Sequence, residues 1–169
     1  SPQVFAKLRQ QTDLLPAVVT AVVHPCDRES LLGAMAAAAA KLIVPILVGP
    51  EAKIRALAQQ ENVDLGKTRI VDTAHSHDSA ALAVALCRSG EAAALMKGSL
   101  HTDEMMSAVT CSKTGLRTGR RLSHVFVMDV PAYPRMLLVT DAAINIAPTI
   151  RDKADICQNA IDLARVLGI

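Results

Sequence analysis

The sequence predicts an α/β protein, a three-layer sandwich in which helices cover both faces of a mostly parallel sheet. Short β-branched runs alternate with longer Ala- and Leu-rich segments along most of the 169 residues, and this alternation predicts parallel strands joined by helical crossovers. The runs at 17–23 and 44–48 are almost continuously apolar, which is typical of strands buried on both faces.

Up to residue 113 the predicted strands and helices alternate strictly. They are strand 17–23, helix 30–41, strand 44–48, helix 51–61, strand 69–72, helix 79–88, strand 93–96 and helix 102–113. Gly90 and Gly115 follow two of these helices, at positions where glycine is favoured.

The last third of the chain breaks the alternation. Strands 123–130 and 136–140 are joined by a link too short for a helical crossover, so we expect an antiparallel pair that makes the sheet mixed. A helix over 148–167 closes the chain, with Pro148 in its first turn and Gly168 just past its end. The length fits one domain better than two, which predicts a single α/β domain over residues 1–169.

The composition argues against several classes of protein. A net charge of +2, two Phe, one Tyr and no Trp leave little to bind nucleic acid. The stretch 31–50 is nearly long enough to span a bilayer, but Pro45 and the Gly49–Pro50 pair interrupt it, so a helix followed by a buried strand is the better interpretation. The cysteines at 26, 87, 111 and 157 lack the spacing of a zinc site or disulfide framework, which favours reduced thiols in a cytoplasmic protein.

The loop that follows strand 93–96 is a candidate binding site, because ligands of open α/β sheets bind beyond the carboxyl ends of the strands. Gly98 would let the backbone approach a ligand closely, and Ser99, His101 and Thr102 offer donors at a helix start. A helix cap explains the same residues, with Thr102 as N-cap and acidic residues in the first turn.

Two further groups of polar residues are candidates. Arg117, Arg120 and Arg121 form the one concentrated basic cluster, and arginine forks match phosphate oxygens; a solvated loop is the alternative. Asp141 and Asn145 follow a buried strand. A buried aspartate must be paired or hydrogen-bonded, so it could organise the loop or contact a substrate.

Other motifs are weaker. Neither Gly66-Lys67-Thr68 as a phosphate loop nor His75 and His77 as a metal site has the required context, and we expect no metal. Adjacent residues of a strand point to opposite faces, so Ser123 and His124 are not expected to cooperate. Cys111 and Cys157 lie in apolar helix patterns and are interpreted as core thiols, which leaves no nucleophile constellation.

Three stretches together resemble one family. They are ALMKGSLHT at 94–102, SHVFVMDVP at 123–131 and LVTDAAINIAP at 138–148, followed by QNAIDLA at 158–164 and LGI at 167–169. The combination resembles the bacterial phosphate acetyltransferase and phosphate butyryltransferase family. The sequence of these stretches is most similar to the short butyryl-type members and to the domain fused to an enoyl-CoA hydratase.

The resemblance implies an isopropylmalate-dehydrogenase-like fold with two domains and an active site in the cleft between them. It implies acyl transfer between coenzyme A and inorganic phosphate by direct attack, with no covalently bound cofactor, in a homodimer or larger homo-oligomer. Family members are about twice as long, so this chain would be most of the N-terminal half, nearly inactive alone, with the main catalytic groups in the missing half. The alternative is a non-catalytic acyl-CoA-binding or regulatory module.

Matching the family's motifs residue by residue gives the positions expected to line the cleft, while the acetyl or butyryl preference stays open. They are Lys97, Gly98, Ser99, His101, Thr102, Arg120, Arg121, Ser123, Asp141 and Asn145.

Overall fold

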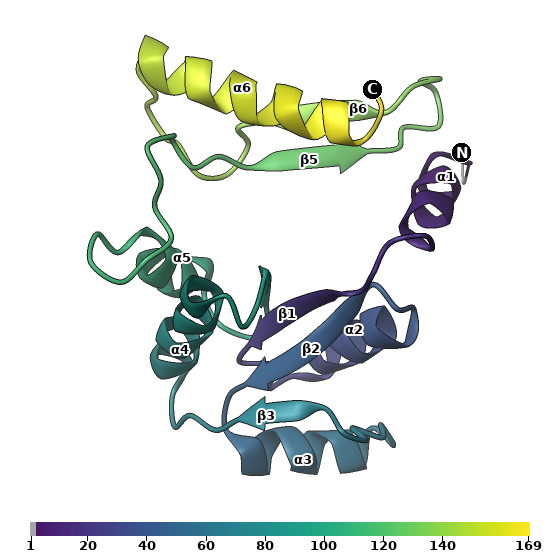
Figure 1. The fold of residues 1–169 in the computed structure, drawn as a ribbon, viewed down its shortest axis with the longest axis vertical. Helices are drawn as coiled ribbons and strands as arrows, with labels where there is room; N and C mark the ends of the chain where they lie inside the picture. The colour runs from purple at the N-terminus through teal and green to yellow at the C-terminus, as the bar shows by residue number, and fades with distance from the viewer. Residues whose placement is uncertain (1–2) are drawn as a thin grey trace. The chain divides into compact units, whose positions relative to one another are not determined.

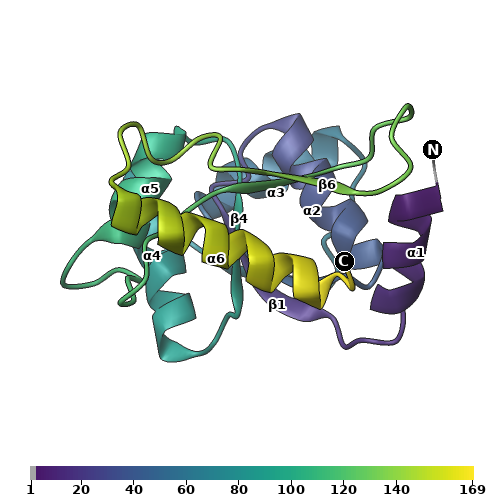
Figure 2. The same cartoon turned by 90° about the horizontal axis from the view of Figure 1, so that it is seen from above.

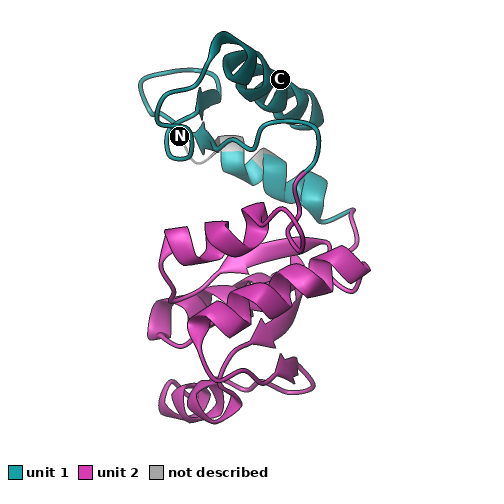
Figure 3. Cartoon of the chain, turned by 90° about the vertical axis from the view of Figure 1, so that its left-hand side faces the viewer, with its two compact units in different colours: residues 1–14, 118–169 teal, residues 15–117 magenta. Residues whose placement is uncertain are grey.

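The computed structural model describes residues 3–169, which divide into two compact units. The larger unit is Leu15–Arg117, and the smaller combines the residues up to 14 with Thr118–Ile169 (Figure 3).

The larger unit holds a four-stranded sheet in which every pairing is parallel. Its strands are β1 (Val18–Val23), β2 (Ile43–Val48), β3 (Arg69–Val71) and β4 (Ala94–Lys97), in the order β3-β2-β1-β4. The helices between and after them are α2 (Arg28–Ala39), α3 (Glu51–Gln60), α4 (Ser76–Ser89) and α5 (Thr102–Thr110) (Figure 1). The predicted alternation and the α/β fold class are confirmed.

Neighbouring residues of the central strand β1 face two different cores, which makes this unit three-layered. Ala21 and Val23 pack with residues of α4 and α5 on one face of the sheet. Val22 packs on the other face with Leu31 of α2 and Ile54 of α3, and all three of these side chains are fully buried. Burying such a side chain contributes about 1.5–3 kcal/mol, so β1 stabilises both layers of helices.

The apolar stretch at 31–50 is a helix followed by a strand, as predicted. Helix α2 ends at Ala39, Lys41 adopts a positive φ of 58°, and β2 begins at Ile43. Within the described residues, no helix combines the length and the apolar character needed to cross a membrane.

The smaller unit contains two antiparallel strands and a long helix. Strands β5 (Val125–Met128) and β6 (Leu137–Thr140) pair from Val125↔Thr140 to Met128↔Leu137, and α6 (Ile150–Val166) packs against β6 (Figure 2). The antiparallel pairing is confirmed. The expectation of one mixed sheet is corrected, because β5 and β6 pair only with each other and leave the larger sheet wholly parallel.

Several helix boundaries differ from the prediction for local reasons. Helix α6 begins after Pro148, because Thr149 forms a capping box with Asp152 and displaces the proline from the first turn. Helix α5 ends at Thr110, short of the predicted residue 113. Helix α1 (Gln3–Thr12) was not predicted, since its composition is mostly polar and gives little apolar periodicity.

Gly98 is required where β4 passes the end of β1. Its N–H donates to the Val23 carbonyl over 2.8 Å, and an added Cβ would lie 2.3 Å from that oxygen and 2.7 Å from the His24 oxygen. The sequence led us to expect that the backbone at Gly98 approaches a ligand closely. In the structure it approaches the end of the neighbouring strand β1 instead.

We expect Gly98→Ala to lower the free energy of unfolding by about 1–3 kcal/mol, because the added methyl group forces two backbone segments apart. Gly119→Ala is the matched control, since a Cβ there meets nothing within 4 Å, and it should change stability by less than about 0.5 kcal/mol. Urea unfolding of both variants tests this, and equal stabilities would contradict it.

Candidate functional site

The structure places the predicted site residues in two groups of five, one in each compact unit. The larger unit carries Lys97, Gly98, Ser99, His101 and Thr102, and the smaller unit carries Arg120, Arg121, Ser123, Asp141 and Asn145. Residues are brought together within each group.

Two of the polar side chains after β4 bind the protein's own backbone. The Ser99 hydroxyl donates to the His24 carbonyl over 2.9 Å and accepts from the Cys26 N–H over 3.1 Å. The Lys97 ammonium donates to the carbonyls of Leu100 and Gly98 over 2.7 and 3.2 Å. These contacts fix the loop against the end of β1, so both side chains have a structural role.

His101 and Thr102 remain exposed at the start of α5. The N-cap is His101, with β-region backbone angles and no side-chain hydrogen bond to the first turn; the expectation that Thr102 is the N-cap is therefore wrong. The first-turn N–H groups of α5 lack a side-chain cap, which leaves them able to donate to an anion.

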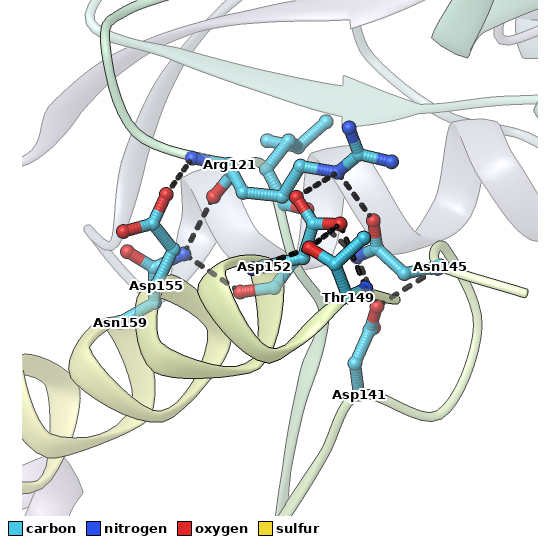
Figure 4. Close-up of polar contacts among 9 residues, drawn as sticks. Arg121, Asp141, Asn145, Thr149, Asp152, Asp155 and Asn159 are labelled. Carbon is cyan, nitrogen blue, oxygen red and sulfur yellow. Dashed lines mark hydrogen bonds and ion pairs between the residues drawn. The ribbon is translucent and has the colours of Figure 1, made fainter. Parts of the chain in front are cut away.

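Asp141 is the centre of the polar network in the smaller unit (Figure 4). One carboxylate oxygen accepts the His124 N–H over 2.9 Å, and the other accepts the N–H of Asn145 over 2.8 Å as well as its side-chain amide. Burial alone would raise the pKa of Asp141, but the hydrogen bonds from Asn145, His124 and Ala143 outweigh it and lower the pKa to about 2. The aspartate therefore organises the loop after β6, one of the two interpretations of the sequence.

Arg121 is held by this network through part of its guanidinium. Its Nε donates to the Asn145 side-chain oxygen over 2.7 Å and lies 3.8 Å from a carboxylate oxygen of Asp152. Its backbone N–H donates to Asp155 over 2.9 Å. Figure 4 shows its two terminal nitrogens without contacts to the residues drawn, so that end of the fork is open to an anion.

Arg120 and Ser123 are bound to α6. The Arg120 guanidinium forms a 2.6 Å ion pair with Asp162 and a 3.3 Å hydrogen bond to Asn159. The Asn159 amide donates to the Arg121 carbonyl over 2.9 Å and to the Ser123 hydroxyl over 2.7 Å.

Sequence reasoning missed the partners that α6 supplies. Asp152, Asp155, Asn159 and Asp162 are spaced by three, four and three residues, which places them on one face of a helix. That spacing, read beside the basic cluster, could have identified them.

Ser123 and His124 do not form a nucleophile–base pair. The Ser123 hydroxyl contacts Asn159, whereas the His124 ring packs edge-on against Phe126 at 4.3 Å. The His124 Nδ1 is buried and has no hydrogen-bond partner among the described residues. The described side chains also include no group of three His, Cys, Asp or Glu that could hold a metal ion.

All four cysteines are free, but two are not the core thiols that the sequence suggested. Cys157 is exposed on α6. Cys111 follows the end of α5, where hydrogen bonds from the Thr114 hydroxyl and the N–H groups of Thr114 and Lys113 lower its pKa to about 7. Burial raises the pKa of Cys26 and Cys87.

We expect Asp141→Asn to lower the free energy of unfolding near neutral pH by about 1.5–3 kcal/mol, the usual contribution of a hydrogen bond to a charged group. The folded pKa, about 2, lies below the ordinary 3.8. The stabilisation is therefore fully present above about pH 4 and is lost as the pH falls through about 2.

Urea unfolding at pH 7, 5, 4 and 3 measures the difference between wild type and Asp141→Asn, with exposed Asp13→Asn as control. The difference should shrink in acid. A difference that is constant over this range, or equal to that of the control, would contradict the role given to the charge.

We expect iodoacetamide to modify Cys111 faster than Cys26 or Cys87 at pH 7, because only the thiolate reacts. Peptide mass spectrometry across pH 6–9 should give a half-maximal rate for Cys111 near pH 7. Thr114→Val should move that midpoint upward by removing a hydrogen bond to the sulfur. An unchanged midpoint in this variant would refute the cause.

Comparison with known proteins identifies relatives of this chain. Residues 73–169 match the family described as phosphate acetyl/butaryl transferase. The phosphate acetyltransferase of Rhizobium meliloti is 60% identical over 151 residues, which cover 89% of this chain and 48% of that protein. The phosphate butyryltransferase of Clostridium beijerinckii is 34% identical, over 98% of this chain and 55% of that protein.

A solved structure shares the fold. A phosphotransacetylase from Streptococcus pyogenes superposes with a TM-score of 0.83 and 19% identity, covering 99% of this chain and 59% of its own. The chain spans about half the length of the curated relatives it matches. With the family match extending over more than half of its residues, the chain belongs to the phosphate acetyl/butyryl transferase family.

Proposed function

We propose that the complete protein transfers an acetyl or butyryl group between coenzyme A and inorganic phosphate. The observation that carries this proposal is the family match over residues 73–169 together with the 60% identity to a phosphate acetyltransferase. In the forward direction a phosphate oxygen attacks the thioester carbonyl and the carbon–sulfur bond breaks. The products are an acyl phosphate and coenzyme A, whose thiolate takes up a proton.

The arrangement of polar groups supports direct transfer. Direct attack requires phosphate to be held in line and the carbonyl oxygen to be stabilised, but it requires no enzyme nucleophile. The open end of the Arg121 fork suits the first task. Within the larger unit, the uncapped start of α5, with exposed His101 and Thr102, presents N–H groups that can donate to a negatively charged oxygen. Ser123 and His124, which do not contact each other, agree with a mechanism that lacks an acyl-enzyme.

We propose that the two compact units are most of the N-terminal half of a two-domain enzyme. The chain spans about half of its curated relatives, so groups needed for chemistry would come from the other half. The chain alone is then nearly inactive. We expect the complete protein to be a homodimer or larger homo-oligomer, which light scattering would measure.

Free-thiol release from acetyl-CoA and butyryl-CoA, with and without phosphate, tests the activity. The complete protein should release thiol only when phosphate is present, and residues 1–169 alone should be nearly inactive. Absence of phosphate-dependent release by the complete protein refutes the transferase and favours the non-catalytic acyl-CoA-binding module. Full activity of residues 1–169 refutes the proposal that groups needed for chemistry come from the other half.

Of the two adjacent arginines, Arg121 is the better candidate to bind phosphate. Arg120 is held at 2.6 Å by Asp162, whereas Arg121 lies 3.8 Å from Asp152 and keeps its terminal nitrogens open.

We expect Arg121→Ala in the complete enzyme to raise the KM for phosphate or acyl-CoA roughly ten- to a hundredfold, because a hydrogen bond to a charged group contributes about 1.5–3 kcal/mol. Arg120→Ala should act mainly on stability. Exposed Arg117→Ala is the matched control and should change KM less than a few-fold, since exposed charges contribute about 0–1 kcal/mol.

Each KM is measured at fixed ionic strength, and circular dichroism confirms folding. If a folded Arg121→Ala enzyme keeps kcat and both KM values within threefold, the basic cluster is a solvated loop and the arginine has no part in substrate binding.

A further inference from the structure

An open cavity lies beyond the carboxyl ends of β1, β2 and β3 in the larger unit, and the proposed acyl transfer assigns it no role. Its volume is about 710 Å³. The loops that follow the three strands and the first turns of α3 and α4 form its lining, which consists of His24, Pro50, Lys53, Ala74, His75, Ser76 and His77. Four of these seven residues carry basic side chains, and they come from three different segments of the chain.

His24 is held in a defined orientation. Its backbone has a positive φ of 54°, and its Nδ1 lies 3.0 Å from the hydroxyl of fully buried Ser79. That hydroxyl also lies 2.7 Å from the Thr73 hydroxyl and 3.0 Å from the His75 carbonyl.

The contacts of Ser79 fix which nitrogen of His24 carries hydrogen. A carbonyl can only accept and a hydroxyl has one hydrogen to donate, so all three contacts become hydrogen bonds only if Ser79 donates to His75. His24 Nδ1–H and Thr73 must then donate to Ser79. His24 lines the cavity, and its Nε2 is left for a ligand: as an acceptor when the ring is neutral and as a donor when it is protonated.

Lys53 provides the permanent positive charge of the cavity. It lies in the first turn of α3, is exposed, and forms no ion pair among the described residues. It is near enough to His24 to lower that residue's pKa, an effect second only to burial and opposed by Glu104. His75 and His77 stack with ring centroids 5.5 Å apart at the start of α4.

The acidic residues around the cavity each bind a donor of the protein. Glu104 accepts from the Ser76 hydroxyl, and Asp78 lies 3.2 Å from the His77 Nε2. Asp72 accepts the N–H of Glu51 over 2.8 Å, and Asp27 accepts that of Ser30 over 2.8 Å. The Lys53 ammonium and the imidazoles of His24 and His75 are thus the groups left to bind a ligand.

We infer that this cavity binds a phosphate group, with Lys53 and His24 as its principal ligands. The compact ammonium of Lys53 matches phosphate oxygens. The His24 imidazole can accept the O–H of a singly protonated phosphate at Nε2 when the ring is neutral, and can donate to a phosphate oxygen when the ring is protonated. The starts of α3 and α4 add first-turn N–H groups that no N-cap side chain occupies, apart from the Glu51 N–H that Asp72 accepts. Which phosphate binds rests on the proposed function, whose reactants carry two kinds: inorganic phosphate and the 3′-phosphate of coenzyme A.

Steady-state kinetics of the complete enzyme distinguish these two sources. Lys53→Gln should raise one KM about tenfold and leave kcat within twofold. If the 3′-phosphate is bound, the KM for coenzyme A rises while that for dephospho-coenzyme A does not. If inorganic phosphate is bound, the KM for phosphate rises instead. Lys67→Gln, in an exposed turn ahead of β3, is the matched control and should change neither.

Equal effects of Lys53→Gln on coenzyme A and dephospho-coenzyme A, with no change in the KM for phosphate, would overturn the inference.

Binding measured without turnover separates this inference from the proposed function. Titration calorimetry with adenosine 3′,5′-bisphosphate and with inorganic phosphate should show binding of one of them to the complete protein, weakened about tenfold by Lys53→Gln and unchanged by Lys67→Gln. Such binding supports the site even if the protein has no acyl transfer activity. If neither probe binds, or both lysine variants weaken binding equally, there is no such site.

Discussion

The backbone carbonyl of His24 is the constraint on which the carboxyl-end edge of the parallel sheet depends. It accepts the N–H and the hydroxyl of Ser99 and the N–H of Cys26, so that the ends of β1 and β4 and the two loops after them form one hydrogen-bonded group. Gly98 makes this possible, because any Cβ would collide with the same strand end. The left-handed backbone of His24 then directs its imidazole toward Ser79 and the cavity. One residue therefore joins the sheet, the loop before α5 and the basic cavity.

In the smaller unit, charged side chains hold the strand ends and loops together. Asp141 gathers N–H groups from two segments and binds Asn145, which in turn orients Arg121. Acidic and amide side chains on one face of α6 bind the loop that carries Arg120 and Arg121. Hydrogen bonds to a low-pKa carboxylate stay intact through the physiological pH range, since Asp141 is ionised there. A guanidinium fixed at one end and open at the other can bind an anion with little loss of side-chain freedom.

Features of the fold that depend on residues close in the chain could be predicted from the sequence, and features that depend on distant residues could not. Continuous apolar runs and helix periodicity predicted every element of the larger unit, because each reports on residues close in the chain. The sequence could not show whether strands β5 and β6 join the parallel sheet or form a sheet of their own, because their apolar pattern is the same in both cases. For the same reason Ser99 could be interpreted as a ligand-binding donor: its partners, His24 and Cys26, lie more than seventy residues away. Arg121 and Asn145 were identified as polar candidates, but their contact also depends on the fold.

These contacts distinguish polar groups that build the site from those that remain for ligands. Lys97, Ser99, Ser123 and Arg120 bind backbone, amide or carboxylate partners at hydrogen-bond distance, so using them for a substrate would leave those partners unpaired. Arg121, His101, Lys53 and the Nε2 of His24 retain unused donors or lone pairs. A substrate as large as an acyl-CoA carries its phosphates far from its thioester, and binding energy gained there can position the reacting carbonyl. The proposed substrate therefore gives a physical reason for basic groups that bind a phosphate without contacting the reacting carbonyl.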